Sequence, residues 1–128
     1  MGVTLRRNSY PAKTNPLYHF DPETGYFGEH GTGNRHDVRL VYVDDDPTEE
    51  TRALFKILTK GSEIYEVEAN KRWCAILDDG SIITLRINHP TPEHAPAVMI
   101  SVRKGGENAG IKTQKIHFIK KGTKKWKI

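Results

Sequence analysis

The chain has 128 residues, of which 36% are hydrophobic and 28% are charged, and it carries a net charge of +4. This length supports one domain with a modest core, and no apolar run approaches the roughly 18 residues that indicate a membrane-spanning helix. The single cysteine, Cys74, excludes an intrachain disulfide and a zinc site built on paired cysteines. Residues 1–16 include basic side chains but no apolar stretch, so we expect no secretory signal there.

The positive charge is concentrated at the C-terminal end. Residues 103–128 contain nine Lys or Arg and one acid, a local balance of +8, which leaves the rest of the chain at −4. A basic end is typical of proteins that bind a polyanion, and a nucleic acid backbone is the commonest polyanion. A solvated, solubilising tail is the alternative explanation.

The first third of the chain predicts an irregular segment followed by a strand and a helix. Residues 1–37 are rich in proline and glycine, and we expect residues 1–15 to be flexible and residues 16–128 to form a single domain. The pattern VRLVYV at 38–43 predicts a strand. Asp46 is a good N-cap and Pro47 suits the first helical position, so a helix begins here and ends near Gly61.

The remainder predicts a meander of strands. Alternating or β-branched runs occur at 63–69, 72–77, 81–87, 97–103 and 111–119. Asp79-Gly80 is a hairpin signal, and the proline-rich loop 89–96 excludes a central strand there. We therefore predict an α+β fold, with an antiparallel twisted sheet of about five to six strands, one main helix, and the irregular N-terminal segment packed on it.

Alternation sorts the side chains of the last three predicted strands onto two faces. One face is apolar. The other is polar and carries Thr84, Arg86, Ser101, Thr113, Lys115 and His117. If the three strands share a sheet, its open face gathers one imidazole, two fixed cations and three hydroxyls.

This set of groups is suited to metal-free cleavage of RNA. His117 is the candidate general acid or base, because its ordinary pKa lies near neutrality. Lys115 and Arg86 can bind the phosphate and stabilise the charge that develops on it, and Thr113 completes the catalytic set. The further residues expected to bind substrate are Ser101, Thr84, Arg103, Lys120 and Lys121. The alternative is an exposed strand histidine that has no role.

Such chemistry needs a second proton carrier, which the three strands do not supply. His19 or His36 could serve if the N-terminal segment folds over the sheet. We expect no metal and no cofactor: consecutive aspartates at 44–46 point in different directions, and His89 and His94 lack a third ligand. The glycine-rich stretch 25–33 lacks the spacing of a phosphate-binding loop.

The run PAVMISVRKGGENAGIKTQKIHFI at 96–119, together with ITLR at 83–86, resembles the C-terminal toxin tips of bacterial polymorphic toxin systems of the contact-dependent inhibition and Rhs types. The phrase FDPETG at 20–25 is similar to one found near toxin-module junctions. The resemblance covers roughly residues 82–120. Many such tips belong to the barnase–EndoU–colicin–RelE group of metal-independent ribonucleases, which carry their catalytic residues on an antiparallel sheet.

The resemblance implies cleavage of tRNA or rRNA in competing bacteria and neutralisation by a cognate immunity protein. It also implies a monomeric domain that the producing cell delivers as part of a larger effector, and that acts in the target-cell cytoplasm. The positions that match the shared pattern are Arg86, Thr113, Lys115 and His117. The chain departs from the group in showing one clear helix and no helix-borne histidine.

Two other functions remain open at this point. A non-catalytic module could use the same basic face to bind nucleic acid or protein. An NAD-dependent protein-modifying transferase toxin would need a catalytic acid in the sheet, for which Glu66 and Glu68 are the nearest candidates.

Overall fold

The computed structural model describes residues 17–31, 37–87, 95–103 and 110–121, and these form one seven-stranded sheet with one α-helix. The strands are β1 Glu29–His30, β2 Val38–Val43, β3 Ile64–Glu68, β4 Arg72–Ile76, β5 Ile82–Arg86, β6 Ala97–Ser101 and β7 Gln114–Lys120. The helix is α1 Pro47–Leu58, and a short 3₁₀ turn, η3, spans Leu17–His19. The predicted α+β class is confirmed. The strand count is higher than predicted, because two-residue β1 is too short to show an alternation.

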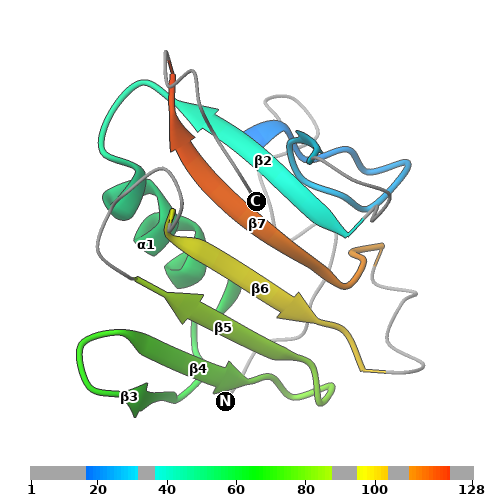
Figure 1. Cartoon of the computed structure of the whole chain (residues 1–128). Helices are drawn as coiled ribbons and strands as arrows, with labels where there is room; N and C mark the ends of the chain where they lie inside the picture. The colour runs from blue at the N-terminus through cyan, green and yellow to red at the C-terminus, as the bar shows by residue number, and fades with distance from the viewer. Residues whose placement is uncertain (1–16, 32–36, 88–94, 104–109, 122–128) are drawn as a thin grey trace.

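The sheet has the order β1-β2-β7-β6-β5-β4-β3, so the last strand in the sequence lies inside it (Figure 1). β7 pairs in parallel with β2 and antiparallel with β6. Parallel neighbours require a crossover connection, and here the chain passes through α1 and the β3–β6 meander before β7 returns beside β2. The predicted hairpins between β3, β4 and β5 are present as antiparallel pairs.

Helix α1 begins and ends where its capping residues predict. The Asp46 carboxylate accepts a hydrogen bond from the Thr48 backbone N–H at 2.9 Å, and Pro47 occupies the first turn. Thr59 caps the C-terminal end, and Gly61 follows with a φ of 85°, a left-handed conformation that glycine adopts without a steric penalty. The helix is too short and too polar to cross a membrane, and so is every other helix in the described ranges.

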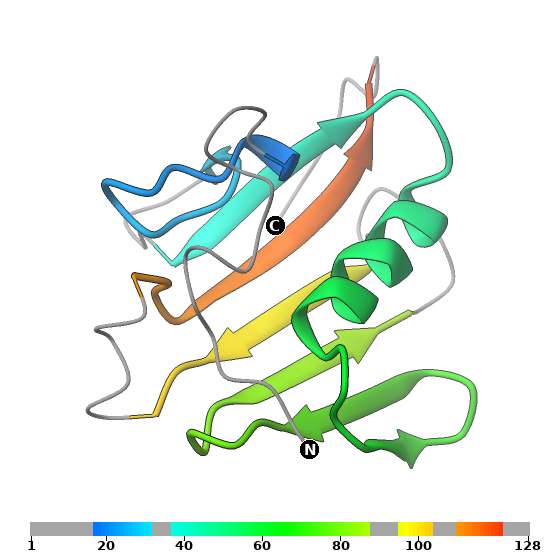
Figure 2. The same ribbon diagram turned by 180° about the vertical axis from the view of Figure 1, so that it is seen from behind.

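Helix α1 and the N-terminal segment lie on the same face of the sheet (Figure 2). Their side chains pack on the apolar residues that the alternation predicted for that face. The core contains Phe20, Phe27, Leu54, Phe55, Ile83, Leu85, Val98, Ile100, Ile116 and Phe118, among others. The opposite face, which we call the open face, is turned toward the viewer in Figure 1. By strand register it carries Leu40, Tyr42, Arg72, Cys74, Thr84, Arg86, Ala97, Met99, Ser101, Lys115, His117 and Ile119.

Buried Gln114 joins the N-terminal segment to the start of β7. Its Oε1 accepts a hydrogen bond from the Phe27 N–H at 2.8 Å, and its Nε2 donates to the carbonyls of Gly25 at 2.9 Å and Lys112 at 2.8 Å. The same segment approaches β2 so closely that a Cβ on Gly28 would overlap the Leu40 carbonyl. The segment is therefore docked by a side-chain amide and by a glycine contact, as well as by its two phenylalanines.

Replacement of Gln114 by leucine should destabilise the protein strongly. The variant leaves the Phe27 N–H and the Lys112 carbonyl without the Gln114 amide, whereas the Gly25 carbonyl keeps its hydrogen bond from the Lys112 N–H at 3.1 Å. Each buried unsatisfied group costs on the order of 1–3 kcal/mol. We expect the free energy of unfolding in urea to fall by about 2–4 kcal/mol. Lys120→Gln, at an exposed position of the same strand, is the control and should change stability by less than about 0.5 kcal/mol. Equal stability of the two variants would contradict the docking role of Gln114.

Candidate functional site

The candidate site on the open face is a row of four residues on neighbouring strands: His117, Ala97, Arg86 and Arg72. Cross-strand register joins His117 to Ala97, Ala97 to Arg86, and Arg86 to Arg72. Ala97 presents only a methyl group, so no large side chain on β6 separates the imidazole from the Arg86 guanidinium. Lys115 precedes His117 by two residues on β7 and projects from the same face. We call the four residues His117, Ala97, Arg86 and Arg72 the central row, and Lys115 lies beside it.

His117 is buried, with an exposed fraction of 5%. The sequence predicted a solvent-facing position, and the structure corrects this. Three residues of the open face, Leu40, Ala95 and Ile119, form a small apolar cluster, and β2 brings Leu40 directly beside His117. A histidine on an edge strand would have remained in water, but β7 has neighbours on both sides.

Burial and two neighbouring cations determine the protonation state of His117. Its pKa is lowered to about 4, first by desolvation and then by the positive charges of Lys115 and Arg86, while an interaction with the backbone of Ala95 acts in the opposite direction. The imidazole is therefore neutral at pH 7 and can accept a proton. Because Lys115 and Arg86 both act on the ring electrostatically, the structure brings together three of the four residues that the sequence assigned to catalysis.

The two arginines of the row present donors that the described residues leave unused. The Nε atoms of Arg86 and Arg72 are buried, and neither has a hydrogen-bond partner within the described part of the chain. Among the described residues, the ion-pair contact of Arg72 is a long one, 3.9 Å from its Nη2 to Glu68 Oε1. Together with Lys115, the row therefore combines one neutral base with three fixed cations.

Two of the predicted substrate-binding residues share the open face with this row. Thr84 lies in the next row, opposite Met99, which is itself opposite Lys115. Ser101 is exposed one row further along, opposite Ile82. Both hydroxyls can reach a ligand that extends along the strands, but neither lies next to His117.

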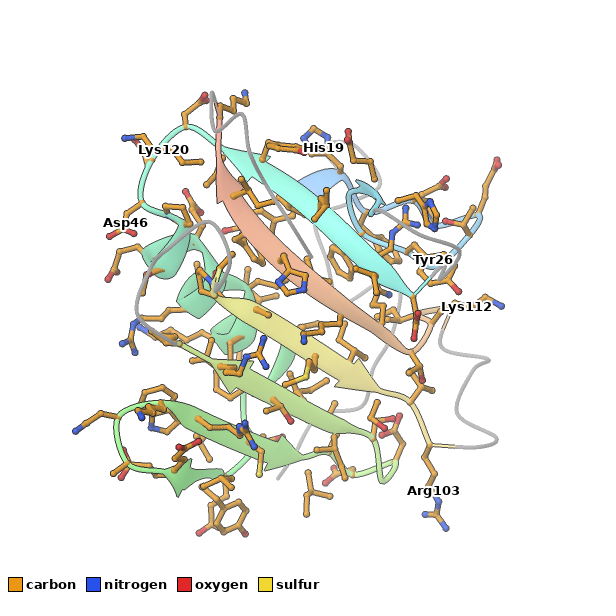
Figure 3. The ribbon with its side chains drawn as sticks, viewed as in Figure 1. His19, Tyr26, Asp46, Arg103, Lys112 and Lys120 are labelled. Atoms are coloured by element: carbon orange, nitrogen blue, oxygen red, sulfur yellow. The ribbon has the colours of Figure 1, made fainter. Side chains whose placement is uncertain are left out.

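Thr113 and the outer cations are not brought to His117. Thr113 lies before β7 begins, and its hydroxyl accepts a hydrogen bond from the Val102 N–H at 3.0 Å, which ties the ends of β6 and β7 together. Arg103 and Lys120 lie at opposite ends of the sheet (Figure 3). The Arg103 side chain passes over the turn at Gly80. Lys121 makes an exposed ion pair with Asp44 at 3.2 Å.

The predicted second proton carriers are not found beside His117. His19 is exposed and belongs to the N-terminal segment, which does fold over the sheet, but on the face that holds α1. The sheet therefore lies between the N-terminal segment and His117. His36 lies outside the residues that the structure describes. Within those residues, no three His, Cys, Asp or Glu side chains lie together as metal ligands would.

The structure adds two residues to the open face that sequence analysis did not select, Tyr42 and Arg72. Tyr42 is opposite Ile119 and packs against the apolar cluster around His117. Alternation within VRLVYV places Leu40 and Tyr42 on one face, but only the pairing of β2 with β7 shows that this is the face of His117. Arg72 is likewise assigned by the pairing of β4 with β5.

No protein-family model, curated protein or solved structure matches the chain. The resemblance to polymorphic toxin tips therefore stays a prediction.

The lowered pKa of His117 should make folding stability depend on pH. The unfolded chain binds a proton at this residue near pH 6.5, whereas the folded chain binds it only near pH 4. Proton uptake therefore favours unfolding as the pH falls through this interval, and the free energy of unfolding should drop by up to about 3 kcal/mol between pH 6.5 and pH 4 from this group.

The measurement is a series of urea titrations across this pH range for the wild type and for His117→Gln, which should lack this component of the slope. His19→Gln is the control, because it replaces an exposed histidine outside the open face, and it should keep the wild-type slope. An NMR titration midpoint of His117 near 6.5 would overturn the assignment.

Proposed function

We propose that this chain is a metal-independent endoribonuclease that acts as a toxin on the RNA of competing bacteria. The observation that supports the proposal is the arrangement of His117, a desolvated neutral imidazole, with Lys115 and Arg86 on the same face. A neutral base next to fixed cations is what cleavage of a phosphodiester by its own 2′-hydroxyl requires.

Phosphate binding completes the activation of His117. The free site holds the pKa of the imidazole low partly because Lys115 and Arg86 are positive. A phosphodiester bound between these cations brings a negative charge that offsets them, so the pKa of His117 rises toward the range in which it takes a proton effectively. The base therefore becomes strongest when the substrate is in place.

In the proposed step, the 2′-oxygen attacks phosphorus while its proton passes to a ring nitrogen of His117. The bond from phosphorus to the 5′-oxygen breaks, and this oxygen takes a proton from the hydroxyl of Tyr42. The products are a 2′,3′-cyclic phosphate and a 5′-hydroxyl, and transfer of the proton from His117 back to Tyr42 through solvent restores both groups. Lys115 and Arg86 stabilise the charge on the phosphorane oxygens.

Tyr42 is chosen as the proton donor because of where β2 places it. It packs against the cluster of Leu40, Ala95 and Ile119, and the Ala95 backbone interacts with His117. Its hydroxyl can donate a hydrogen, and it shares the face of His117, unlike the N-terminal segment that carries His19.

A non-catalytic nucleic-acid-binding module is the second candidate. The Nε donors of Arg72 and Arg86, which have no partner among the described residues, favour it, because a cationic surface binds a phosphate backbone without any proton transfer. The two functions differ in a single outcome, which is whether bound RNA is cut.

The cleavage prediction compares the wild type with His117→Gln in the presence of EDTA. We expect wild-type cleavage to persist in EDTA and to leave 2′,3′-cyclic phosphate ends, and the variant to lose about 10²- to 10⁴-fold in rate. Rates are measured with end-labelled RNA. His30→Gln, which changes an exposed histidine of β1, is the matched control and should keep the wild-type rate. RNA that binds saturably without being cut would establish the binding module instead.

The toxin role is tested with the same pair of variants in living cells. Wild-type protein produced in a bacterial cytoplasm should arrest growth, and His117→Gln should not. An immunity protein that covers the open face should restore growth. Growth arrest by both the wild type and His117→Gln would show that toxicity does not depend on His117.

Replacement of Tyr42 by phenylalanine isolates the proton donor. The variant keeps the ring that packs on the apolar cluster and removes only the hydroxyl, so we expect the folded structure to be retained and kcat to fall about 10²-fold or more, with little change in KM. A substrate whose leaving group needs no proton, such as a nitrophenyl phosphodiester of a ribonucleoside, should be cleaved by Tyr42→Phe at nearly the wild-type rate. An equal loss on both substrates would contradict the role of Tyr42.

A further inference from the structure

Arg72 and Arg86 form a pair of like charges where β4 begins and β5 ends. They are directly opposite each other in the antiparallel β4–β5 ladder, so their side chains leave the same face with Cβ atoms about 5 Å apart. Like charges in this position destabilise a sheet. The fold thus contains an electrostatic cost that the described residues do not offset within the pair.

The polar contacts of this pair are incomplete as well. Both Nε atoms are buried and have no hydrogen-bond partner among the described residues. The acid Glu68 is opposite Arg72 on β3, but its 3.9 Å contact is too long for a hydrogen bond. Both side chains of that ion pair are substantially exposed, at 42% and 51%, so it stabilises the pair only weakly.

An oxyanion would resolve both features. Each guanidinium is a planar fork of N–H donors that matches two oxygens of one phosphate, and a negative charge between the forks removes their repulsion. Arginine is better suited than lysine to this geometry, because its donors are fixed in one plane.

The pair extends too far from His117 for one phosphate to contact all of it. From His117 on β7 to Arg72 on β4 the central row crosses three strand spacings, about 14 Å in all. One phosphate group cannot span that distance. A phosphate held by His117, Lys115 and Arg86 leaves the far side of Arg86, and all of Arg72, to a second one.

We propose that Arg72 and Arg86 bind a second backbone phosphate, so that the site takes a polynucleotide across its strands rather than a single nucleotide. Glu68 occupies the neighbourhood of the Arg72 fork when no ligand is bound, and its carboxylate competes with the phosphate for it. This proposal names the substrate class of the proposed ribonuclease and rests on it for the first phosphate position.

Binding is measured with 2′-deoxy oligonucleotides, because they lack the attacking hydroxyl and so report affinity whether or not the protein cleaves RNA. One probe is a dinucleotide with a single internucleotide phosphate, and the other is a tetranucleotide with three. We expect Arg72→Gln to weaken binding of the tetranucleotide about tenfold, to change binding of the dinucleotide less than twofold, and to reduce the salt dependence of tetranucleotide binding by about one phosphate contact.

Three further variants distinguish a phosphate site from a general effect of charge or folding. Lys71→Gln removes the same charge from the adjacent turn, where the side chain is exposed, and should weaken tetranucleotide binding less than threefold. Arg72→Lys keeps the charge without the fork and should lie between wild type and Arg72→Gln. Glu68→Gln should tighten tetranucleotide binding severalfold. Thermal unfolding of Arg72→Gln without ligand should occur at or above the wild-type temperature, because the variant relieves repulsion.

The proposal is overturned if Lys71→Gln and Arg72→Gln weaken tetranucleotide binding equally, or if Arg72→Gln leaves it unchanged. Its failure is distinguishable from failure of the ribonuclease. Oligonucleotide binding that depends on Arg72, without any RNA cleavage, would support the second phosphate position and contradict the proposed ribonuclease activity. RNA cleavage by the wild type would support the ribonuclease activity. If Arg72→Gln then changed neither oligonucleotide binding nor the cleavage rate, the second phosphate position would be contradicted.

Discussion

The structure depends on the position of β7 between β2 and β6. This strand has neighbours on both sides and side chains buried on both faces. Ile116 and Phe118 enter the core under α1, and on the opposite face the apolar cluster of Leu40, Ala95 and Ile119 includes the β2 neighbour of His117. Because desolvation is the largest influence on the pKa of His117, the same pairing that completes the core also makes this histidine a neutral base.

The repulsion between Arg72 and Arg86 is only weakly compensated in the described part of the chain. The two residues are directly opposite each other on one side of the sheet, and Glu68 makes a long, exposed contact with Arg72. Sheets ordinarily favour opposite charges across strands. A protein that keeps like charges together gains from them when an anion is bound, which is why stability is lost at the place where function is proposed.

Much of the fold could be predicted from local patterns. The caps of α1, the hairpin signals and the period-two alternation of three strands all depend on a few consecutive residues, and the structure agrees with them. The burial of His117 was predicted wrongly, and Tyr42 and Arg72 were not selected, because each depends on which strand lies alongside. Gln114 shows the same limit: nothing near it in sequence predicts that its amide binds the backbone of Phe27 and Gly25.

By itself, the sequence determined the class of the fold, the extent of its helix, and which side chains of β5, β6 and β7 share a face, since alternation along one strand needs no knowledge of its neighbours. Only the tertiary structure decided the order of the strands. That order buries His117, adds Tyr42 and Arg72 to its face, and places the N-terminal segment with His19 on the opposite one. The physical reason is that desolvation and charge act through space, and the strands that supply them to His117 are far from it along the chain.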